Sequence, residues 1–509
     1  MTDAEKEKEK GANEQARLEA QLYYHGIRET EEVISELRHS GDFIVRATLA
    51  DGVFRIFLHV KTKKELVQHW LCVVNNKYCL DTERNNDKRM AFDSVALLIN
   101  HYAQYPLPSG QRLVFGVPRP KWLIRHSSTD YKDQDRLGSG NFCEVFKGTM
   151  TMDGVKKIVA IKVCHGTTDP MDAKLQEVRE AWHSMLYEAK IMSKYRHENI
   201  IEFLGVACDH PPIRIILEYC PGGSLESHLK NDKIEISQVE LVLYAFETAK
   251  GMRYLHTQKC LHRDLAARNC LISSKGQLKI SDFGLSQLVD DMEGKKDEKK
   301  ISNVPLKWMA PETLSKSPVY LLNSDVWSYG VLLYEIFNKG KVVFDDEDDF
   351  KKVAKKIHFG EMPKFPHTAP ELIRTLVREE IWQVEPEKRT MFTEIVPLLL
   401  AYLEEHMAEF PQIDDLAVNK IKGVKRLCIF YTSRQDLLKR DHYIGGVSRR
   451  RSKGRPRSKE EARPRHSKKK KSLSKESKDL KKNDERSDMV GSEYKDYSDD
   501  SKKKRPEKT

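Results

Sequence analysis

Three polar side chains near the middle of the chain have the types and the spacing that phosphoryl transfer requires. Asp264 and Asn269 belong to the run Leu-His-Arg-Asp-Leu-Ala-Ala-Arg-Asn at 261–269, and Asp282 opens an Asp-Phe-Gly run thirteen residues later. One carboxylate can orient a hydroxyl group and accept its proton. A second carboxylate and an amide oxygen are hard ligands that suit Mg²⁺ on a nucleotide. Such a set of side chains is compatible with transfer of a phosphoryl group from a nucleotide to a hydroxyl group.

The two runs resemble the catalytic loop and the metal-binding motif of protein kinases, and Ala-Ala-Arg is similar to the tyrosine-kinase version. The resemblance implies that Asp264 accepts the proton of a tyrosine hydroxyl group and that Arg268 neutralises charge near the transferring phosphate. It implies further that Asn269 and Asp282 bind Mg²⁺, or Mn²⁺ in its place, with ATP as the phosphoryl donor. A single His-Arg-Asp occurs often by chance, so the prediction depends on all nine residues and the Asp-Phe-Gly behind them.

A glycine-rich run at 137–145, Leu-Gly-Ser-Gly-Asn-Phe-Cys-Glu-Val, resembles the kinase loop that lies over the ATP phosphates. Glycines let a hairpin approach the phosphates closely and present backbone N–H groups to them. Cys143 replaces the third glycine of the family pattern, and we expect this change to tune nucleotide binding. The residues that the resemblance places around the nucleotide are Leu137, Gly138, Ser139, Gly140, Asn141, Phe142, Cys143, Glu144, Val145, Ala160, Lys162, Leu217, Glu218 and Cys220.

Lys162 ends an alternating apolar strand, Val-Ala-Ile-Lys, and such a lysine is costly unless it is paired. The expected partner is Glu188 on the next predicted helix. The alternative is that Glu188 is one more exposed helix carboxylate, but its apolar neighbours Leu186, Ile191 and Met192 favour the inward position. By resemblance, Lys162 then holds the α- and β-phosphates of ATP.

Later kinase motifs supply structural support. The resemblance covers about residues 131–405 and implies that Pro305 shapes the shelf for a substrate tyrosine. It also implies that Asp325 braces the catalytic loop and that Glu312 pairs with Arg389.

The region before the kinase-like segment carries one arginine in a phosphate-binding setting. Arg46 ends the run Phe-Ile-Val-Arg, and the pattern predicts helices at 31–37 and 92–102 around strands at 43–46, 53–60 and 66–74. This order, with its Tyr-Tyr-His-Gly entry, resembles an SH2 domain, whose arginine forks onto phosphotyrosine. The resemblance implies a phosphotyrosine site that consists of Arg46, Thr48, His69 and Arg28.

This region departs from the family pattern at three positions. The usual tryptophan at its entry is Tyr23, a second arginine is replaced by Thr30, and the lysine often seen two residues after the histidine is Leu71. The alternative interpretation of Arg46 is a salt bridge at a sheet edge.

The segment that follows Asp-Phe-Gly, residues 285–309, contains no tyrosine. Tyrosine kinases usually carry one there, and its phosphate orders the loop. Our hypothesis is that activation does not need phosphorylation of this loop. Either a fixed carboxylate such as Glu293 or Asp297 substitutes for the phosphate, or the SH2 domain holds the helix that carries Glu188. The alternative is a loop that is simply flexible.

The predicted fold class is α+β. A charged segment at 1–21 precedes an SH2 domain at 22–118, with a central antiparallel sheet between two helices. A linker at 119–130 leads to a two-lobed tyrosine kinase fold at 131–407 and a largely disordered basic tail at 408–509. An odd number of cysteines, nine, favours reduced thiols in a cytosolic or nuclear protein. The sequence shows no signal peptide and no apolar run of about 18 residues.

The positive charge of the chain is concentrated at its end. Residues 449–509 hold 24 Lys and Arg against 12 Asp and Glu, whereas the whole chain has a net charge of +11. Three uses of the tail compete: attraction to an anionic membrane surface, nuclear import or nucleic-acid contact, and plain solubilisation. Of the specific uses, we favour the membrane over nucleic acid, and we expect a cytoplasmic location that extends to the inner face of the cell membrane.

The order of SH2 and kinase regions resembles the C-terminal half of the Fes/Fer non-receptor tyrosine kinases, without the N-terminal membrane-binding half of that family. The first hypothesis is a tyrosine kinase that moves the γ-phosphate of ATP to protein tyrosines and is recruited through phosphotyrosine. The second is an adaptor whose kinase domain is a weakly active or inactive scaffold, which Cys143 and the tyrosine-free loop favour. A serine/threonine kinase conflicts with Ala-Ala-Arg and with Lys-Trp-Met-Ala-Pro-Glu at 307–312.

Overall fold

The computed structural model describes residues 13–50, 53–83, 90–139, 143–164, 175–289, 305–315 and 317–430. The centre of the glycine-rich loop, the middle of the tyrosine-free segment at 290–304 with Glu293 and Asp297, and the basic tail from 431 onward lie outside the described residues. Within the described ranges, no helix is long and apolar enough to cross a bilayer.

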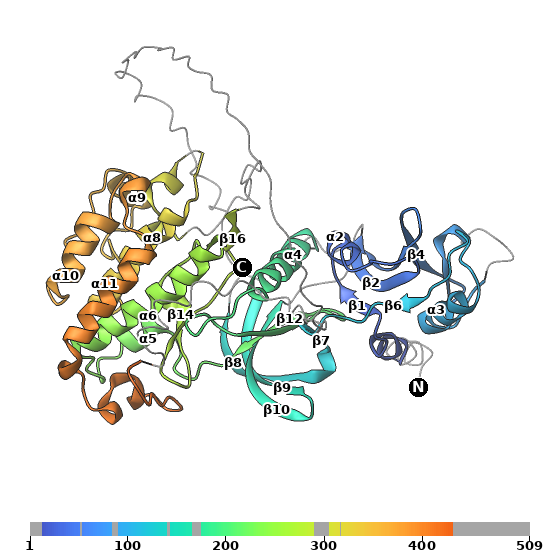
Figure 1. Ribbon diagram of the computed structural model, residues 1–509, viewed down its shortest axis with the longest axis horizontal. Coiled ribbons are helices and arrows are strands. Elements are labelled where there is room, and N and C mark those ends of the chain that lie inside the picture. Colours follow the sequence, from blue (N-terminus) through green and yellow to red (C-terminus); the bar gives the residue numbers. More distant parts are fainter. Residues whose placement is uncertain are drawn as a thin grey trace, which may run out of the picture. The chain divides into compact units, whose positions relative to one another are not determined.

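The N-terminal region is a sheet with α2 on one face and α3 on the other, preceded by a helical stretch at 13–19 (Figure 1). The sheet order is β1-β2-β3-β4-β5, with β6 beside β2, and the pairs from β2 to β5 are antiparallel. Its elements are β1 (Tyr24–Ile27), α2 (Thr30–Ile34), β2 (Asp42–Ala50), β3 (Val53–Lys61), β4 (Leu66–Val74), β5 (Lys77–Leu80), α3 (Val95–Gln104) and β6 (Phe115–Gly116).

The two faces of β2 serve different purposes. Val45 and Ala47 pack into the larger hydrophobic cluster with α3 residues such as Leu98. Side chains alternate along a strand, so Ile44 and Arg46 point to the other face, where Ile44 packs with Val33 of α2. Arg46 therefore lies on the α2 side of the sheet.

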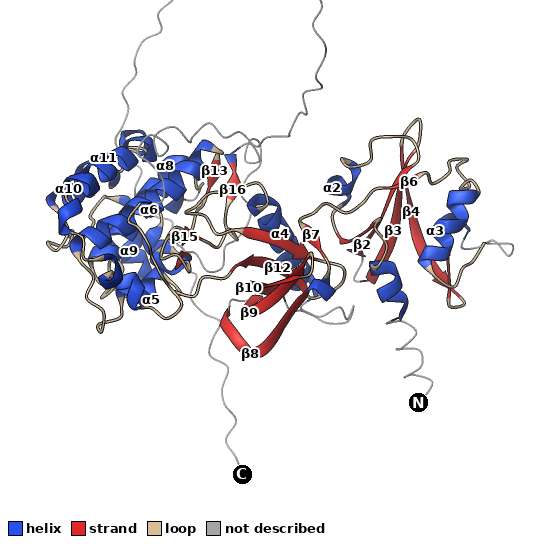
Figure 2. Cartoon of the chain, turned by 60° about the horizontal axis from the view of Figure 1, so that its bottom comes forward, coloured by secondary structure: helices blue, strands red, loops and turns tan. Residues whose placement is uncertain are grey.

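The first part of the kinase region is a second sheet, of order β7-β11-β12-β10-β9-β8, with α4 beside it (Figures 1 and 2). The antiparallel hairpin of β9 and β10 keeps one continuous register from Cys143↔Cys164 to Met152↔Val155. Its elements are β7 (Leu123–Ile124), β8 (Thr129–Ser139), β9 (Cys143–Met152), β10 (Val155–Cys164), α4 (Leu175–Met192), β11 (Phe203–Ala207) and β12 (Ile213–Glu218).

The rest of the kinase region is mainly helical (Figure 2). The long helix α6 begins at a capping box formed by Ser237 and Glu240 and is buried along most of its length. Its helices are α5 (Leu225–Leu229), α6 (Gln238–Thr257), α8 (Leu322–Phe337), α9 (Phe350–His358), α10 (Glu371–Thr375) and α11 (Phe392–Glu405), and its short strands are β13 (Cys260–Leu261), β14 (Cys270–Ile272), β15 (Leu278–Ile280) and β16 (Gln287–Leu288).

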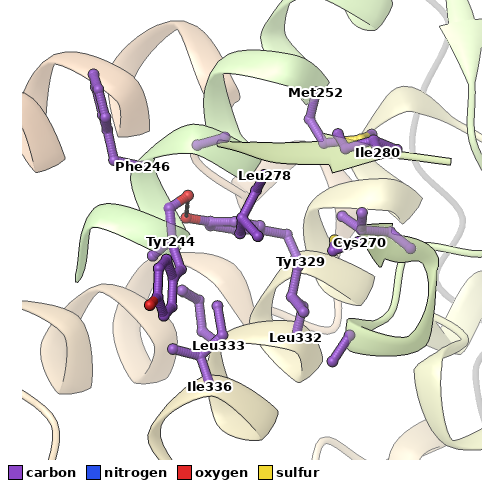
Figure 3. Close-up of a cluster of buried hydrophobic side chains, with 14 of the residues drawn as sticks. Tyr244, Phe246, Met252, Cys270, Leu278, Ile280, Tyr329, Leu332, Leu333 and Ile336 are labelled. Atoms are coloured by element: carbon purple, nitrogen blue, oxygen red, sulfur yellow. Dashed lines mark hydrogen bonds between the residues drawn. The ribbon is translucent and has the colours of Figure 1, made fainter. Parts of the chain in front are cut away.

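The core of this lobe lies between α6, α8 and the β14–β15 hairpin. Figure 3 shows Tyr329 of α8 reaching α6, where its hydroxyl donates to the Ala245 carbonyl at 2.9 Å. Gly251 allows α6 to approach β15, because a Cβ there would lie 2.7 Å from Ile280 Cδ1. The sheet-rich part and the helical part together fit the predicted two-lobed kinase fold.

The ordered chain continues beyond the predicted kinase boundary. Residues 413–430 form short turns that pack against α6 and the β14–β15 hairpin. The Arg426 side chain is 1% exposed and donates to Glu247 at 2.6 Å and to the Gly276 carbonyl at 2.9 Å. The predicted disordered tail therefore begins too early. Residues 413–430 are ordered because Arg426 donates to the buried Glu247 carboxylate and the Gly276 carbonyl of the lobe.

Candidate active site

The pairing of Lys162 with Glu188 links the sheet to α4. The Lys162 ammonium donates to both Glu188 carboxylate oxygens at 2.9 and 2.8 Å and lies 3.5 Å from Asp282. Burial alone would lower the pKa of Lys162, but the two carboxylates outweigh it and raise that pKa. Lys162 is therefore a fixed positive charge between β10, α4 and the Asp-Phe-Gly motif.

Asp264 is held by two residues that follow it in the catalytic loop. The Asn269 amide donates to the Asp264 carboxylate at 2.7 Å and to its carbonyl at 2.8 Å. The Arg268 guanidinium forms an ion pair with the other carboxylate oxygen. Burial raises the pKa of Asp264, although the Arg268 charge opposes the shift. The carboxylate is thus oriented by donors on two sides and is made more basic by its surroundings.

Asp325 braces the catalytic loop from α8. Its two carboxylate oxygens accept the backbone N–H groups of His262 and Arg263, each at 2.9 Å. Arg263 has a φ of 67°, in the left-handed region that non-glycine residues rarely adopt. The two hydrogen bonds to a 1% exposed aspartate stabilise this conformation and fix the turn that leads to Asp264.

Asn269 and Asp282 have donor atoms that fit a hard divalent cation. The amide nitrogen of Asn269 is used by Asp264, which leaves the amide oxygen as the atom that would ligate a cation. The charge of Lys162 lowers the pKa of Asp282, so this carboxylate is ionised at neutral pH. In the described part of the chain, no group of three or more His, Cys, Asp or Glu side chains could hold a metal by itself. Such a sparse oxygen set suits an ion that keeps waters and nucleotide phosphates as further ligands.

The nucleotide-binding residues that the structure describes lie on neighbouring strands. Val145 of β9 is directly opposite Lys162 of β10, and Ala160 is opposite Leu217 of β12. The Glu218 carboxylate is paired with Lys279 at 2.9 Å. Gly140, Asn141 and Phe142 lie outside the described residues.

The remaining described members of this set lie at the loop ends and in the connecting segment. Leu137, Gly138 and Ser139 end β8, with Gly138 opposite Val145 and Ser139 opposite Glu144. Glu144 is turned to Arg136 at 2.7 Å. Cys143 begins β9, and Cys220 follows β12.

A buried carboxylate connects the catalytic loop to the predicted substrate shelf. One oxygen of Glu335 accepts both the Ala267 backbone N–H and the Trp308 indole N–H, each at 3.0 Å. The Arg268 guanidinium lies 4.3 Å from the centre of the Trp308 ring. Glu335, Trp308, Arg268 and Asp264 therefore form one continuous chain of contacts. The sequence motifs contain Trp308 but gave no signal for Glu335.

The pairing of Glu312 with Arg389 has the predicted geometry. Two guanidinium nitrogens donate to the two carboxylate oxygens at 2.8 Å each, and Arg389 is buried. This bidentate pair ties the end of the shelf segment to the helical lobe.

Arg46 in the N-terminal region is buried and has no carboxylate partner among its described hydrogen bonds. Its guanidinium donates to the His59 ring at 2.8 Å, to the Arg28 carbonyl at 2.8 Å and to the Thr30 hydroxyl. A buried guanidinium bound to neutral acceptors keeps its full charge available to an anion. Thr48 lies two residues along the same strand, on the same face.

The structure does not bring His69 and the Arg28 side chain to Arg46. His69 is opposite Leu58, on the α3 face of the sheet, whereas Arg46 is on the α2 face. The Arg28 guanidinium donates to Glu36 at 2.9 Å and stacks on Trp122, so its charge is already compensated. The histidine beside Arg46 is His59, and the lysine two residues after it is Lys61.

The N-terminal region contacts the kinase sheet through Asp209. This buried carboxylate accepts from Arg119 at 2.6 Å and from the His126 backbone N–H at 2.9 Å, and the Tyr24 hydroxyl donates to the Asp209 carbonyl. Gly26 has a φ of 68°, and a Cβ there would lie 2.2 Å from the Cys208 carbonyl oxygen. The glycine of the Tyr-Tyr-His-Gly entry is therefore required by this close approach.

Comparison with known proteins places this geometry in a family. A family model for protein tyrosine and serine/threonine kinases matches residues 131–399. Fer-related kinase 1 of Caenorhabditis elegans is 33% identical over 390 residues, which cover 75% of this chain and 94% of that protein. The transforming protein Fps of avian sarcoma virus (strain PRCII) is 33% identical over 392 residues, which cover 76% and 68%. Tyrosine-protein kinase Fer of Rattus norvegicus is 32% identical over 381 residues, which cover 73% and 43%. The chain therefore belongs to the protein tyrosine and serine/threonine kinase family, within the group of Fer and Fps kinases.

Proposed function

We propose that the protein is a non-receptor tyrosine kinase that transfers the γ-phosphate of ATP to tyrosines of protein substrates. The observation that carries the proposal is the contact chain from Asp264 through Arg268 to Trp308. Asp264 would orient the tyrosine hydroxyl and accept its proton, and Arg268 would lie beside the transferring phosphate. Its planar guanidinium on the Trp308 ring would also define the edge of the tyrosine shelf.

The nucleotide and its cation would bind on the side of Asp264 that faces away from Trp308 and the substrate shelf. Lys162 would bind the α- and β-phosphates, and Asn269 and Asp282 would hold Mg²⁺ or Mn²⁺. The bound cation would neutralise charge that develops on the β- and γ-phosphate oxygens. Glu188 would keep Lys162 in place, since it already accepts both of its hydrogen bonds.

The test compares the full chain with its Asp264→Asn variant, using Mg-ATP and a tyrosine-containing polymer. We expect tyrosine phosphorylation by the full chain and a fall of at least about a hundredfold in the variant, the lower range for a lost general base. Equal rates for the two proteins would favour the alternative, an adaptor whose kinase domain is a scaffold. A serine-containing polymer, run in parallel, distinguishes a serine/threonine kinase.

We propose further that the N-terminal region is an SH2 domain that binds phosphotyrosine through Arg46, Thr48 and Thr30. Arg46→Ala should abolish binding of phosphotyrosine peptides. His59→Ala should weaken it, because the His59 ring holds the Arg46 guanidinium from one side. His69→Ala is the matched control, a buried histidine on the other face of the same sheet, and should bind as tightly as the wild type. Unchanged affinity in Arg46→Ala would remove the assignment.

We propose that the docked N-terminal region replaces loop phosphorylation by holding α4. Trp182 and Met185 of α4 share one hydrophobic cluster with residues of the N-terminal region, and His183 lies 3.2 Å from Glu29. Glu188 follows His183 on the same helix, about one and a half turns further along. The test treats active enzyme with a phosphatase that acts on serine and threonine, because residues 285–309 contain serine but no tyrosine. A large loss of rate that maps to this segment would contradict the proposal.

The basic tail supports one further proposal, a cytoplasmic location with attachment to anionic membranes. The basic runs at 449–451, 468–471 and 502–505 would contribute about 1 kcal/mol for each residue near the surface. The full chain should therefore sediment with vesicles that contain phosphatidylserine and not with neutral vesicles. Equal sedimentation with both, or with neither, would leave solubilisation as the role of the tail.

A further inference from the structure

Two cysteines face each other across the hairpin that carries the glycine-rich loop. Cys143 is the first residue of β9, Cys164 is the last residue of β10, and the register places them directly opposite. Opposite residues of an antiparallel pair point to the same face, with Cβ atoms about 4.5–5.5 Å apart. The two thiols lie within hydrogen-bonding reach of each other.

The thiols lie next to the phosphate-binding lysine. Lys162 is two residues before Cys164 on β10 and therefore points to the same face. The hydrogen bond from Cys164 and the charge of Lys162 lower the pKa of the Cys143 thiol, although burial opposes them. Cys143 is partly exposed, whereas Cys164 is fully buried. Cys143 is thus the thiol that an oxidant reaches first, and Cys164 is the thiol positioned to react with it.

We propose that Cys143 and Cys164 are a peroxide-sensitive pair that closes to a disulfide at the base of the glycine-rich loop. The Cys143 thiolate attacks hydrogen peroxide, the O–O bond breaks, and protonated hydroxide leaves as water, which gives a sulfenic acid. The Cys164 sulfur then attacks the Cys143 sulfur, the S–O bond breaks, and the hydroxide leaves with the thiol proton as a second water. Two thiols are oxidised and one peroxide is reduced to two waters.

Closure changes the geometry where the phosphates would bind. A disulfide needs Cβ atoms about 3.5–4.5 Å apart, so β9 is drawn toward β10 by about 1 Å at this pair. Val145, the residue opposite Lys162, is two positions further along β9. We therefore expect the disulfide to raise the KM for ATP several-fold. This effect rests on the proposed kinase activity, whereas formation of the disulfide does not.

A second cysteine pair in the same molecule provides a matched comparison. Cys72 and Cys79 are opposite each other on β4 and β5, with sulfur atoms 3.4 Å apart. Both are buried, at 3% and 0% exposure, so peroxide has no partly exposed thiol to attack there. The strand register is the same for both pairs and would make them equally reactive. The Cys143 pair differs because peroxide can reach Cys143 and because the Lys162 ammonium lies nearby.

The experiment exposes the reduced full chain to hydrogen peroxide, blocks the remaining thiols by alkylation and maps peptides by mass spectrometry without reduction. We expect a peptide pair linked through Cys143 and Cys164, lighter by two hydrogen atoms, together with a higher KM for ATP. Dithiothreitol should reverse both. Each variant is compared with its own untreated rate: Cys143→Ser, Cys143→Gly and Cys164→Ala should lose the link and the response, and the double variant Cys72→Ser/Cys79→Ser should keep both.

Three results would overturn the proposal: oxidation of Cys143 to sulfinic acid without a link to Cys164, a link that leaves the KM for ATP unchanged, or a persistent response in Cys143→Ser. Cys164→Ala avoids a buried hydroxyl group, and Cys143→Gly restores the glycine of the family pattern, so loss of folding in one variant leaves the other to decide. A chain that forms the link but transfers no phosphate contradicts the kinase assignment and not the thiol pair.

Discussion

Replacement of Glu335 by alanine tests whether the catalytic loop and the substrate shelf are held as one unit. Glu335 is 2% exposed, and one of its oxygens accepts the N–H groups of both Ala267 and Trp308. It does not approach the reacting atoms itself, so it is a positioning residue. The alanine variant removes the only described contact that joins these two N–H groups.

The size of the effect follows from the two lost bonds. Each buried N–H group left without an acceptor costs about 1–3 kcal/mol. Relaxation and entering water recover part of this, so we expect about 1.4–2.7 kcal/mol to appear as lost transition-state stabilisation. This corresponds to a fall of about ten- to a hundredfold in kcat/KM for a tyrosine peptide. Glu335→Gln keeps an acceptor oxygen at the same place and should stay within about threefold of the wild type.

The assay separates the peptide from the nucleotide. The KM for ATP should not change in Glu335→Ala, because Lys162 and Asp282 are held by contacts that do not involve Glu335. Glu247→Ala is the matched control, since Glu247 is 4% exposed and accepts the Leu278 N–H and an Arg426 donor away from the shelf. It should lower stability and leave the peptide KM unchanged.

A double-mutant cycle with Trp308→Phe sharpens the result, because phenylalanine keeps the ring under Arg268 and removes the indole donor. The two changes should be strongly non-additive. If Glu335→Ala lowered the melting temperature but left peptide kinetics at the wild-type value, or if the cycle were additive, the positioning role of Glu335 would be refuted.

Three other predictions concern stability and the interface. Burial raises the pKa of Glu335 to about 7, so its contribution to stability is present below the unfolded value near 4.5 and is lost as pH rises through 7. As pH rises from about 5 to 8, the free energy of unfolding of Glu335→Gln, measured in urea, should therefore gain up to about 3 kcal/mol relative to the wild type. Arg426→Ala leaves the Glu247 charge buried and unpaired and should cost about 3–5 kcal/mol in urea unfolding. Asp209→Ala removes the acceptor of Arg119 and should reduce turnover and expose the linker at 119–130 to protease; unchanged turnover and cleavage would contradict the interface role.

The pairing of Lys162 with Glu188 could be predicted because two local patterns converge on it. An alternating strand ending in lysine and a helix with a carboxylate among apolar residues each need the other to satisfy a buried charge. The catalytic loop could be predicted for a similar reason. Its residues are close together in the sequence, and only one distant residue, Asp325, is needed to brace them.

The proposed phosphotyrosine site shows why His69 does not lie beside Arg46, where the sequence predicted it. His69 resembles the family histidine by its place on a strand, but side-chain direction depends on the register. The register of β2 with β3 pairs Arg46 with Phe57, so His59, two residues further, shares the Arg46 face. The next pairing sets Leu58 opposite His69 and places it on the other face. Counting residues through both turns would have distinguished the two histidines.

Glu335 and the segment 413–430 could not be found in this way. A buried carboxylate on α8 has no sequence signal until the chain brings Ala267 and Trp308 to it. The terminal segment packs as isolated turns, without the periodicity that marks a helix or a strand. Its stability comes from Arg426 and from partners about 150 and 179 positions away in the sequence.

That terminal segment also sets where an independently folding catalytic fragment can end. The Ala417 N–H donates to Glu240 at 2.6 Å, and Gly423 lies against Pro221, beside the connection between the lobes. A fragment cut at the end of α11 would leave Glu240 without this donor and Glu247 without its counter-charge, and it would uncover one flank of the connection. An expression fragment of this kinase should therefore include residues 413–430, and a fragment that ends at Glu405 should unfold at a lower urea concentration than one that keeps them.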